Sequence, residues 1–195
     1  MYRYVKRVFD FLLSLLGLII LSLLLLLISI VIIIDSKGPI LFKQRRIGMN
    51  KREFVMYKFR TMRVDAPHDT PTHLLKNANN HITGVGRLLR KTSLDELPQL
   101  WNILKGDMSI IGPRPALWNQ YDLIEARDKY HVNEIKPGLT GWAQIQGRDE
   151  LEIPKKAYYD GQYYKLMSFI MDWRCFWGTI AYVLKGKGVI EGQKE

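Results

Sequence analysis

The sequence predicts an α+β fold that is mainly helical and begins with a membrane-embedded helix. Residues 11–34 form an uncharged run dominated by Leu and Ile, and residues 40–47 and 53–59 are two β-prone runs joined by a short polar turn. In later segments, apolar residues recur at helical spacing. The expected organisation is a membrane helix over residues 1–36 and a small cytosolic domain over residues 37–195 that lies on the membrane surface.

The apolar run at residues 11–34 is long enough to enter a bilayer. As a helix, its 24 residues would reach roughly 36 Å, against a hydrocarbon core of about 30 Å. A buried core helix is the alternative, but so small a chain could hardly cover such a helix on all sides. Positive residues flank both ends of the run: Arg3, Lys6 and Arg7 before it, and Lys37, Lys43, Arg45 and Arg46 after it.

The two positive flanks leave two topologies open, because positive residues favour the cytoplasmic side of a membrane. A helix that enters and returns on the same face satisfies both flanks. A straight span with its N-terminus outside satisfies only the heavier C-terminal flank. A re-entrant helix needs a break, for which Gly17 and Ser22 are the candidates in mid-run. We expect the re-entrant arrangement.

Composition indicates the class of partner. A net charge of +10 and a pI of about 9.7 predict anionic partners, such as nucleic acid, phospholipid or a phosphorylated small molecule. The single cysteine, Cys175, excludes an intrachain disulfide and a multi-cysteine metal site, and its aromatic neighbours predict a packed thiol. The four histidines show no metal-ligand spacing and are expected at the surface: His68, His73, His81 and His131.

Beyond the apolar run, the sequence predicts a basic hairpin, a loop and several helices. The hairpin occupies residues 40–59, and residues 65–82 are typical of a mobile polar loop. Residues 116–130 predict a helix. One face of that helix would carry Leu117, Trp118, Tyr121 and Ile124. Residues 154–164 and 169–185 mix basic and aromatic side chains, which suits amphipathic helices at a membrane interface. Ordinary packing of these rings in a core is the alternative.

An acidic pair, Asp95 and Glu96, carries the candidate chemistry. One interpretation is structural, because Ser93 and Glu96 have the spacing of a capping box, and acidic residues in a first turn suit the helix dipole. Pro98 argues that the helix begins later or bends, since its ring crowds the carbonyl four residues back. The acidic pair would then be accessible to a ligand.

Six short motifs follow the apolar run. They are Asp35-Ser36-Lys37-Gly38-Pro39, Gln44-Arg45-Arg46-Ile47-Gly48, Tyr57-Lys58-Phe59-Arg60-Thr61-Met62, Leu94-Asp95-Glu96-Leu97-Pro98-Gln99, Gly112-Pro113-Arg114-Pro115 and Lys136-Pro137-Gly138-Leu139-Thr140-Gly141-Trp142. In this order they resemble the bacterial sugar transferase family, small monotopic phosphoglycosyl transferases, over nearly the whole chain. The resemblance implies transfer of a phospho-sugar from a UDP-sugar to undecaprenyl phosphate, with release of UMP, as the first step of assembling a cell-surface glycoconjugate.

The resemblance also implies roles for individual residues. Asp95 matches the family's nucleophile, which would form a covalent phospho-sugar intermediate in a ping-pong mechanism, and Glu96 matches a ligand of Mg²⁺. Four cations would bind the substrate phosphates: Lys58, Arg60, Arg90 and Arg114. Asp172 is a further candidate metal ligand. Neighbouring arginines are expected to keep Asp95 ionised at neutral pH.

The family usually has a Ser-Pro pair in the middle of the membrane segment, and this chain has Ser22-Leu23 there. The resemblance places the protein in the bacterial inner membrane, with a catalytic domain over residues 37–195 on the cytoplasmic face. Membrane lipids would then be partners and nucleic acid would not. Two alternatives come from other classes. One is a membrane-anchored basic protein that binds nucleic acid or acidic lipid without catalysis, and the other is an adaptor whose acidic pair only caps a helix.

Overall fold

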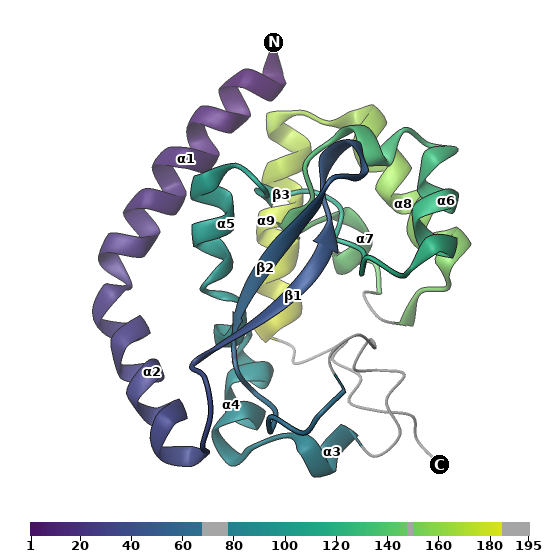
Figure 1. Ribbon diagram of the computed structural model, residues 1–195. Helices are drawn as coiled ribbons and strands as arrows, with labels where there is room; N and C mark the ends of the chain where they lie inside the picture. Colours follow the sequence, from purple (N-terminus) through teal and green to yellow (C-terminus); the bar gives the residue numbers. More distant parts are fainter. Residues whose placement is uncertain (68–77, 148–149, 185–195) are drawn as a thin grey trace.

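Helices make up most of the chain in the computed structural model (Figure 1), which describes residues 1–67, 78–147 and 150–184. The described elements are α1 (Tyr2–Ile20), α2 (Ser22–Asp35), β1 (Leu41–Ile47), the 3₁₀ turn η1 (Met49–Lys51), β2 (Glu53–Phe59), α3 (Ala78–His81), α4 (Gly84–Thr92), the 3₁₀ turn η3 (Leu94–Glu96), α5 (Gln99–Lys105), β3 (Ser109–Ile111), α6 (Tyr121–Asp128), the 3₁₀ turn η4 (Val132–Glu134), β4 (Gly138–Thr140), α7 (Trp142–Ile145), α8 (Ile153–Leu166) and α9 (Phe169–Leu184). The mainly helical α+β prediction is confirmed.

The N-terminal apolar segment is a pair of helices, α1 and α2, bent by 61°. The break lies at Leu21, directly before Ser22, which is one of the two predicted positions. The Ser22 hydroxyl donates to the Ile19 carbonyl over 2.8 Å, and a serine that bonds the preceding turn can bend a helix without proline. Within the described residues, no single helix is long and apolar enough to cross a bilayer, whereas this bent pair together has the length and composition to do so.

Helix α1 distributes polarity in the reverse of the usual way. Its buried residues are Asp10 and Ser14, on the side turned toward the rest of the protein. Its large apolar side chains are exposed, among them Val8, Leu12 and Ile19. An amphipathic helix on a water-soluble protein turns its apolar stripe inward. The exposed side of α1 is therefore suited to an apolar surrounding.

The basic hairpin is confirmed. Strands β1 and β2 pair antiparallel with Leu41 opposite Phe59 and Ile47 opposite Glu53. Asn50 in the connecting turn adopts a positive φ of 55°, a conformation that asparagine tolerates better than most residues. In Figure 1 the hairpin lies between the bent pair α1–α2 on one side and helices α6 and α8 on the other.

A second sheet is small and parallel. Ser109 of β3 pairs with Gly138 of β4, and Ile111 pairs with Thr140. The two backbones approach so closely that a Cβ on Gly138 would lie 2.1 Å from the nitrogen of Gly112. Glycine is therefore required there. This pairing brings the loops that follow the two strands together.

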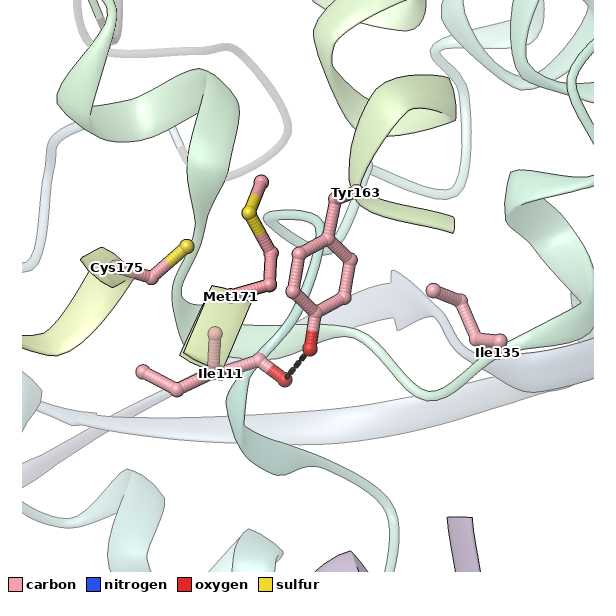
Figure 2. Close-up of a cluster of buried hydrophobic side chains, with 5 residues drawn as sticks. All are labelled: Ile111, Ile135, Tyr163, Met171 and Cys175. Atoms are coloured by element: carbon pink, nitrogen blue, oxygen red, sulfur yellow. Dashed lines mark hydrogen bonds between the residues drawn. The ribbon is translucent and has the colours of Figure 1, made fainter. Parts of the chain in front are cut away.

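Figure 2 shows the buried cluster that supports β3. Tyr163 and Met171 pack around Ile111. The Tyr163 hydroxyl oxygen lies 3.2 Å from the Ile111 carbonyl oxygen, and the hydroxyl proton is shared between that carbonyl and the nearer Asp172 carboxylate. Cys175 is fully buried in this cluster, as predicted, and burial together with the nearby Asp172 carboxylate raises the pKa of its thiol to about 12. The cluster joins α8 and α9 to the strand that leads to Arg114.

Several expectations about helices and loops need correction. The helix expected at residues 116–130 is shorter: α6 starts at Tyr121, whose ring is exposed, and Leu117 is buried ahead of it. The single apolar face proposed for that segment is wrong. Within the predicted loop at residues 65–82, the described part includes helix α3. His68 and His73 lie outside the described residues.

The remaining histidines and the C-terminal aromatic residues can be placed directly. His131 is exposed, as expected, and the side chain of His81 is 31% exposed. Four exposed rings of α9 contact one another: Phe169, Trp173 and Phe176 stack in sequence, and Trp177 meets Trp173 and Phe176 edge-on. The alternative of ordinary core packing therefore does not hold for these four rings, although it does hold for Tyr163 of α8, which is buried. Contact with a membrane interface remains a prediction.

Candidate active site

The acidic pair lies on the 3₁₀ turn η3, between α4 and α5. Ser93 precedes the pair in the left-handed region, with φ of 57°, and its side chain makes no capping hydrogen bond. The capping-box prediction is therefore wrong. Helix α5 begins only at Gln99, directly after Pro98, which agrees with the steric clash expected of proline inside a helix. Asp95 and Glu96 thus sit on a short connection between two helices.

Glu96 is held by two cations from other elements. Its Oε1 accepts a hydrogen bond from Lys58 Nζ at 2.8 Å and one from Arg114 Nη2 at 3.1 Å. Lys58 belongs to β2, and Arg114 stands in the loop that follows β3. Because Glu96 is buried, these charge-assisted bonds offset much of the cost of removing its carboxylate from water.

Asp95 is half-buried beside the same cations. Burial raises the pKa of its carboxyl, the charges of Lys58, Arg90 and Arg114 lower it, and the neighbouring Glu96 raises it again. The net change is upward, because removal from water is the largest effect. The arginines oppose this desolvation without cancelling it, and the expectation that they keep Asp95 ionised at neutral pH stays a prediction.

Lys58 experiences the opposite effect from the same environment. Burial lowers the pKa of its ammonium group, and the attraction of Glu96 works against that change. Burial therefore weakens the charged form of both an acid and a base in the same small volume. Such perturbed pairs mark functional sites more often than purely structural ones.

Arg90 joins the site from the last turn of α4. Its Nε donates to the Thr61 hydroxyl over 2.9 Å, and its charge acts on Asp95. Thr61 was not anticipated as a positioning group, although it stands in the same motif as Lys58. The signal available in the sequence was a hydroxyl directly after Arg60, in the motif that also contains Lys58.

Arg60 lies away from the acidic pair, at the end of α2. Its guanidinium is buried and donates to the carbonyls of Lys37 and Ser36, each at 2.6 Å, and of Ile32 at 3.4 Å. The carbonyls of Ser36 and Lys37 lie just beyond the C-terminal end of α2, where a helix leaves carbonyls without intrahelical partners, whereas Ile32 also accepts from the Ser36 N–H. The structure therefore places Arg60 at the exit of the bent helix pair, not with the acidic pair.

Asp172 is also occupied away from the acidic pair. One of its oxygens accepts hydrogen bonds from Tyr2 and Lys6 of α1, and the other accepts one from Tyr163 at 2.6 Å. Among the described residues, no three His, Cys, Asp or Glu side chains converge in a way that could hold a metal ion. Asp95, Glu96 and Asp172 therefore do not form a common metal site.

The carboxylates of Asp95 and Glu96 still suit Mg²⁺ in their donor chemistry. This ion is usually bound by one or two carboxylates, with substrate phosphates and water completing its octahedron. Three cations, Lys58, Arg90 and Arg114, surround these two anions, so the immediate site carries an excess of one positive charge. This excess positive charge suits a phosphorylated substrate, which would bind next to a carboxylate.

Comparison with known proteins identifies the class. The family model for bacterial sugar transferases matches residues 1–186, so the chain belongs to the bacterial sugar transferase family. It is 40% identical to an uncharacterized sugar transferase, EpsL, of Bacillus subtilis over 94% of this chain and 89% of that protein. It is 39% identical to an exopolysaccharide production protein, PSS, of Rhizobium leguminosarum over 94% of this chain and 97% of that protein.

A longer relative carries a more specific name. The UDP-glucose:undecaprenyl-phosphate glucose-1-phosphate transferase of Xanthomonas campestris is 39% identical over 93% of this chain. The match covers only 39% of that protein, so this chain corresponds to one part of it. The two shorter relatives match nearly end to end.

Proposed function

We propose that this protein transfers a sugar phosphate from a UDP-sugar to undecaprenyl phosphate and releases UMP, as the first step in building a cell-surface glycoconjugate. The name of the Xanthomonas relative supports the reaction, and that of the Rhizobium relative supports the pathway class. The observation that carries the proposal is the Glu96 carboxylate, held by Lys58 and Arg114 beside a half-buried Asp95.

Asp95 is the nucleophile in this proposal. Its carboxylate oxygen attacks the sugar-bearing phosphorus of the UDP-sugar, a bond forms between that oxygen and phosphorus, and the bridging P–O bond breaks as UMP leaves. An oxygen of undecaprenyl phosphate then attacks the same phosphorus, and the Asp95 carboxylate is released. A covalent intermediate divides one difficult transfer into two steps and gives ping-pong kinetics.

Cations make the first step possible. A carboxylate and a diphosphate repel each other unless their charges are neutralised. Removing one oriented donor to a developing oxyanion costs roughly 3 kcal/mol, and arginine offers such donors in a bidentate fork. Arg114 and Arg90 are the guanidinium groups that the fold brings to Asp95 and Glu96. Mg²⁺ bound through Glu96 would add further neutralisation of the phosphate oxygens.

The lipid substrate requires the site to lie at a membrane. We assign the bent pair α1–α2 to a re-entrant membrane segment on the cytoplasmic face of the inner membrane. Both ends of the pair bond the same body, through Tyr2 and Lys6 to Asp172 at one end and through Arg60 at the other. A straight span would put these ends on opposite sides of the bilayer. The exposed apolar side of α1 supports the same assignment.

The test is direct detection of the intermediate. Purified protein in detergent or nanodiscs is incubated with Mg²⁺ and a panel of UDP-hexoses and UDP-N-acetylhexosamines, without lipid acceptor, and analysed by intact and peptide mass spectrometry. We expect one sugar phosphate on Asp95 and release of one UMP for each protein molecule.

Two outcomes would overturn the proposal. One is turnover with lipid acceptor that never leaves an adduct on Asp95, and the other is turnover unimpaired when divalent cations are chelated. Indifference to every UDP-sugar, combined with salt-sensitive oligonucleotide binding, would favour the non-catalytic alternative.

A further inference from the structure

The first three turns of α1 are bonded to the elements that carry the site. The Arg7 guanidinium donates to the carbonyls of Ile103 and Leu104, at 2.7 and 2.8 Å, and so caps the C-terminal end of α5. The Asp10 carboxylate, only 4% exposed, accepts a hydrogen bond from the backbone N–H of Ile110 at 3.0 Å. Asp10 thus joins the membrane helix to β3.

Strand β3 leads directly to the site. Among the strands of the described residues, β3 pairs only with β4, and directly after β3 the Gly112 N–H donates to the Thr140 carbonyl at 2.8 Å. Four residues after Ile110 the chain reaches Arg114, whose guanidinium meets Glu96. A shift of β3 is therefore passed to Arg114 through a connection too short to absorb it, particularly with Pro113 fixing one backbone angle.

A buried carboxylate on a helix whose other side is apolar needs a reason, because burying a charge without partners is expensive. Asp10 has the Ile110 N–H as a direct partner and lies near a cation, Lys136. Its charge acts on Lys136, and both Arg7 and Lys136 approach Gly106, next to the capped end of α5. Asp10 thus lies where α5, β3 and the loop before β4 meet.

We propose that Asp10 is a positioning residue for Arg114: its bond to the Ile110 N–H fixes β3, and β3 fixes the reach of the Arg114 guanidinium to Glu96 and to the substrate phosphate. This inference rests on the proposed function. It means that the N-terminal helix takes part in building the phosphate site as well as in holding the protein at the bilayer.

The test compares Asp10→Ala and Asp10→Asn with a control, Ser14→Ala. Asparagine keeps an oxygen that can accept from the Ile110 N–H. Ser14 is fully buried one turn further along the same helix, and within the described part of the chain its hydroxyl donates to its own helix, at the Phe11 carbonyl. We measure kcat and KM for UMP release and hydrogen exchange at the Ile110 amide.

We expect Asp10→Ala to lower kcat roughly 10- to 100-fold, the scale of an ångström-sized misplacement near reacting groups, and to speed exchange at Ile110. Asp10→Asn and Ser14→Ala stay within about threefold of the parent protein. In a double-mutant cycle, Asp10→Ala adds little to Arg114→Ala, because the two changes remove one shared interaction.

The positioning role would be overturned if the kcat losses of Asp10→Ala and Arg114→Ala multiplied in the double variant. It would also be overturned if Asp10→Ala left hydrogen exchange at the Ile110 amide unchanged. An Asp10→Asn variant as poor as Asp10→Ala would overturn it as well. If Asp10→Ala does not accumulate folded, Asp10→Glu takes its place, because its longer side chain displaces the carboxylate without removing it. An inactive parent protein would refute the proposed function instead, so the two failures are distinguishable.

Discussion

Two buried carboxylates of this protein bind arginine, and their surroundings differ. Asp160 of α8 accepts two hydrogen bonds from Arg127 of α6, at 2.9 and 2.6 Å, and these side chains are only 1% and 5% exposed. Glu96 accepts from Lys58 and Arg114, which are 15% and 27% exposed. The first pair is sealed from water. The second remains open at its edge and has another carboxylate next to it.

The difference shows what separates a structural ion pair from a reactive one. A single arginine fork on Asp160 joins two helices and leaves no side exposed to a ligand. The site at η3 draws its cations from β2, α4 and the loop after β3, so a phosphate can reach charges that no single element supplies. Burial raises the pKa of Asp160 as well as that of Asp95, so the distinguishing feature is that Asp95 is only half-buried and lies beside cations from several elements.

Replacement of the nucleophile is expected to have the largest effect. Asp95→Asn should lower UMP release by about 10³-fold or more, the scale seen when a covalent nucleophile is removed, while the protein stays folded and membrane-bound. Asp122→Asn, an exposed acid in the first turn of α6, is the matched control and should leave turnover unchanged. Substantial turnover by Asp95→Asn would remove Asp95 as the nucleophile.

A second experiment neutralises the two carboxylates, Asp160 and Glu96, in separate variants. Asp160→Asn leaves the Arg127 guanidinium buried without its counter-ion, so we expect the free energy of unfolding to fall by about 3–5 kcal/mol. Glu96→Gln, at the more open site, should cost less stability and more activity. Thermal unfolding in detergent and turnover at a temperature where both variants are folded separate these effects. Equal losses of stability would contradict the distinction.

The pH dependence should show a smaller effect. Because the pKa of Asp95 is raised above the ordinary 3.8, the nucleophile becomes protonated, and kcat/KM falls, at a pH above that of an exposed aspartate. A raised carboxyl pKa also means that the native state binds this proton more tightly than the unfolded state does. The contribution of Asp95 to stability therefore declines as pH rises from 3.8 through the raised value.

The pH profile of kcat/KM and unfolding at several pH values check both parts of this prediction. The unfolding midpoint of Asp95→Asn relative to the parent should increase as pH rises through that window. If the acidic limb of the kcat/KM profile had its midpoint at or below pH 3.8, the charges of the arginines would outweigh the desolvation of Asp95.

Local patterns allowed much of the fold to be predicted. The hairpin follows from two β-prone runs around a short turn, and the break next to Ser22 follows from the shortage of other polar residues in the apolar run. The late start of α5 follows from Pro98. Each of these depends on neighbours within a few residues, where propensity and sterics decide the outcome.

What the sequence could not predict depends on long-range contacts. Arg60 bonds carbonyls more than 20 residues earlier, at the end of α2, and Asp172 bonds Tyr2 across 170 residues. Nothing in the spacing of charges distinguishes an arginine that caps a helix from one that binds substrate. The role of Asp10 escaped attention for the same reason, because its partner is a backbone amide 100 residues away.

The burial of Cys175 makes site-specific cysteine labelling possible in this protein. With its thiol buried and its pKa raised to about 12, almost none of it is thiolate at neutral pH, so alkylating reagents will pass it by. It is also the one cysteine of the sequence. A cysteine introduced at Arg3 can thus be labelled with a membrane-impermeant maleimide in the otherwise native protein, and protection in intact cells that is lost on permeabilisation would place the N-terminus inside.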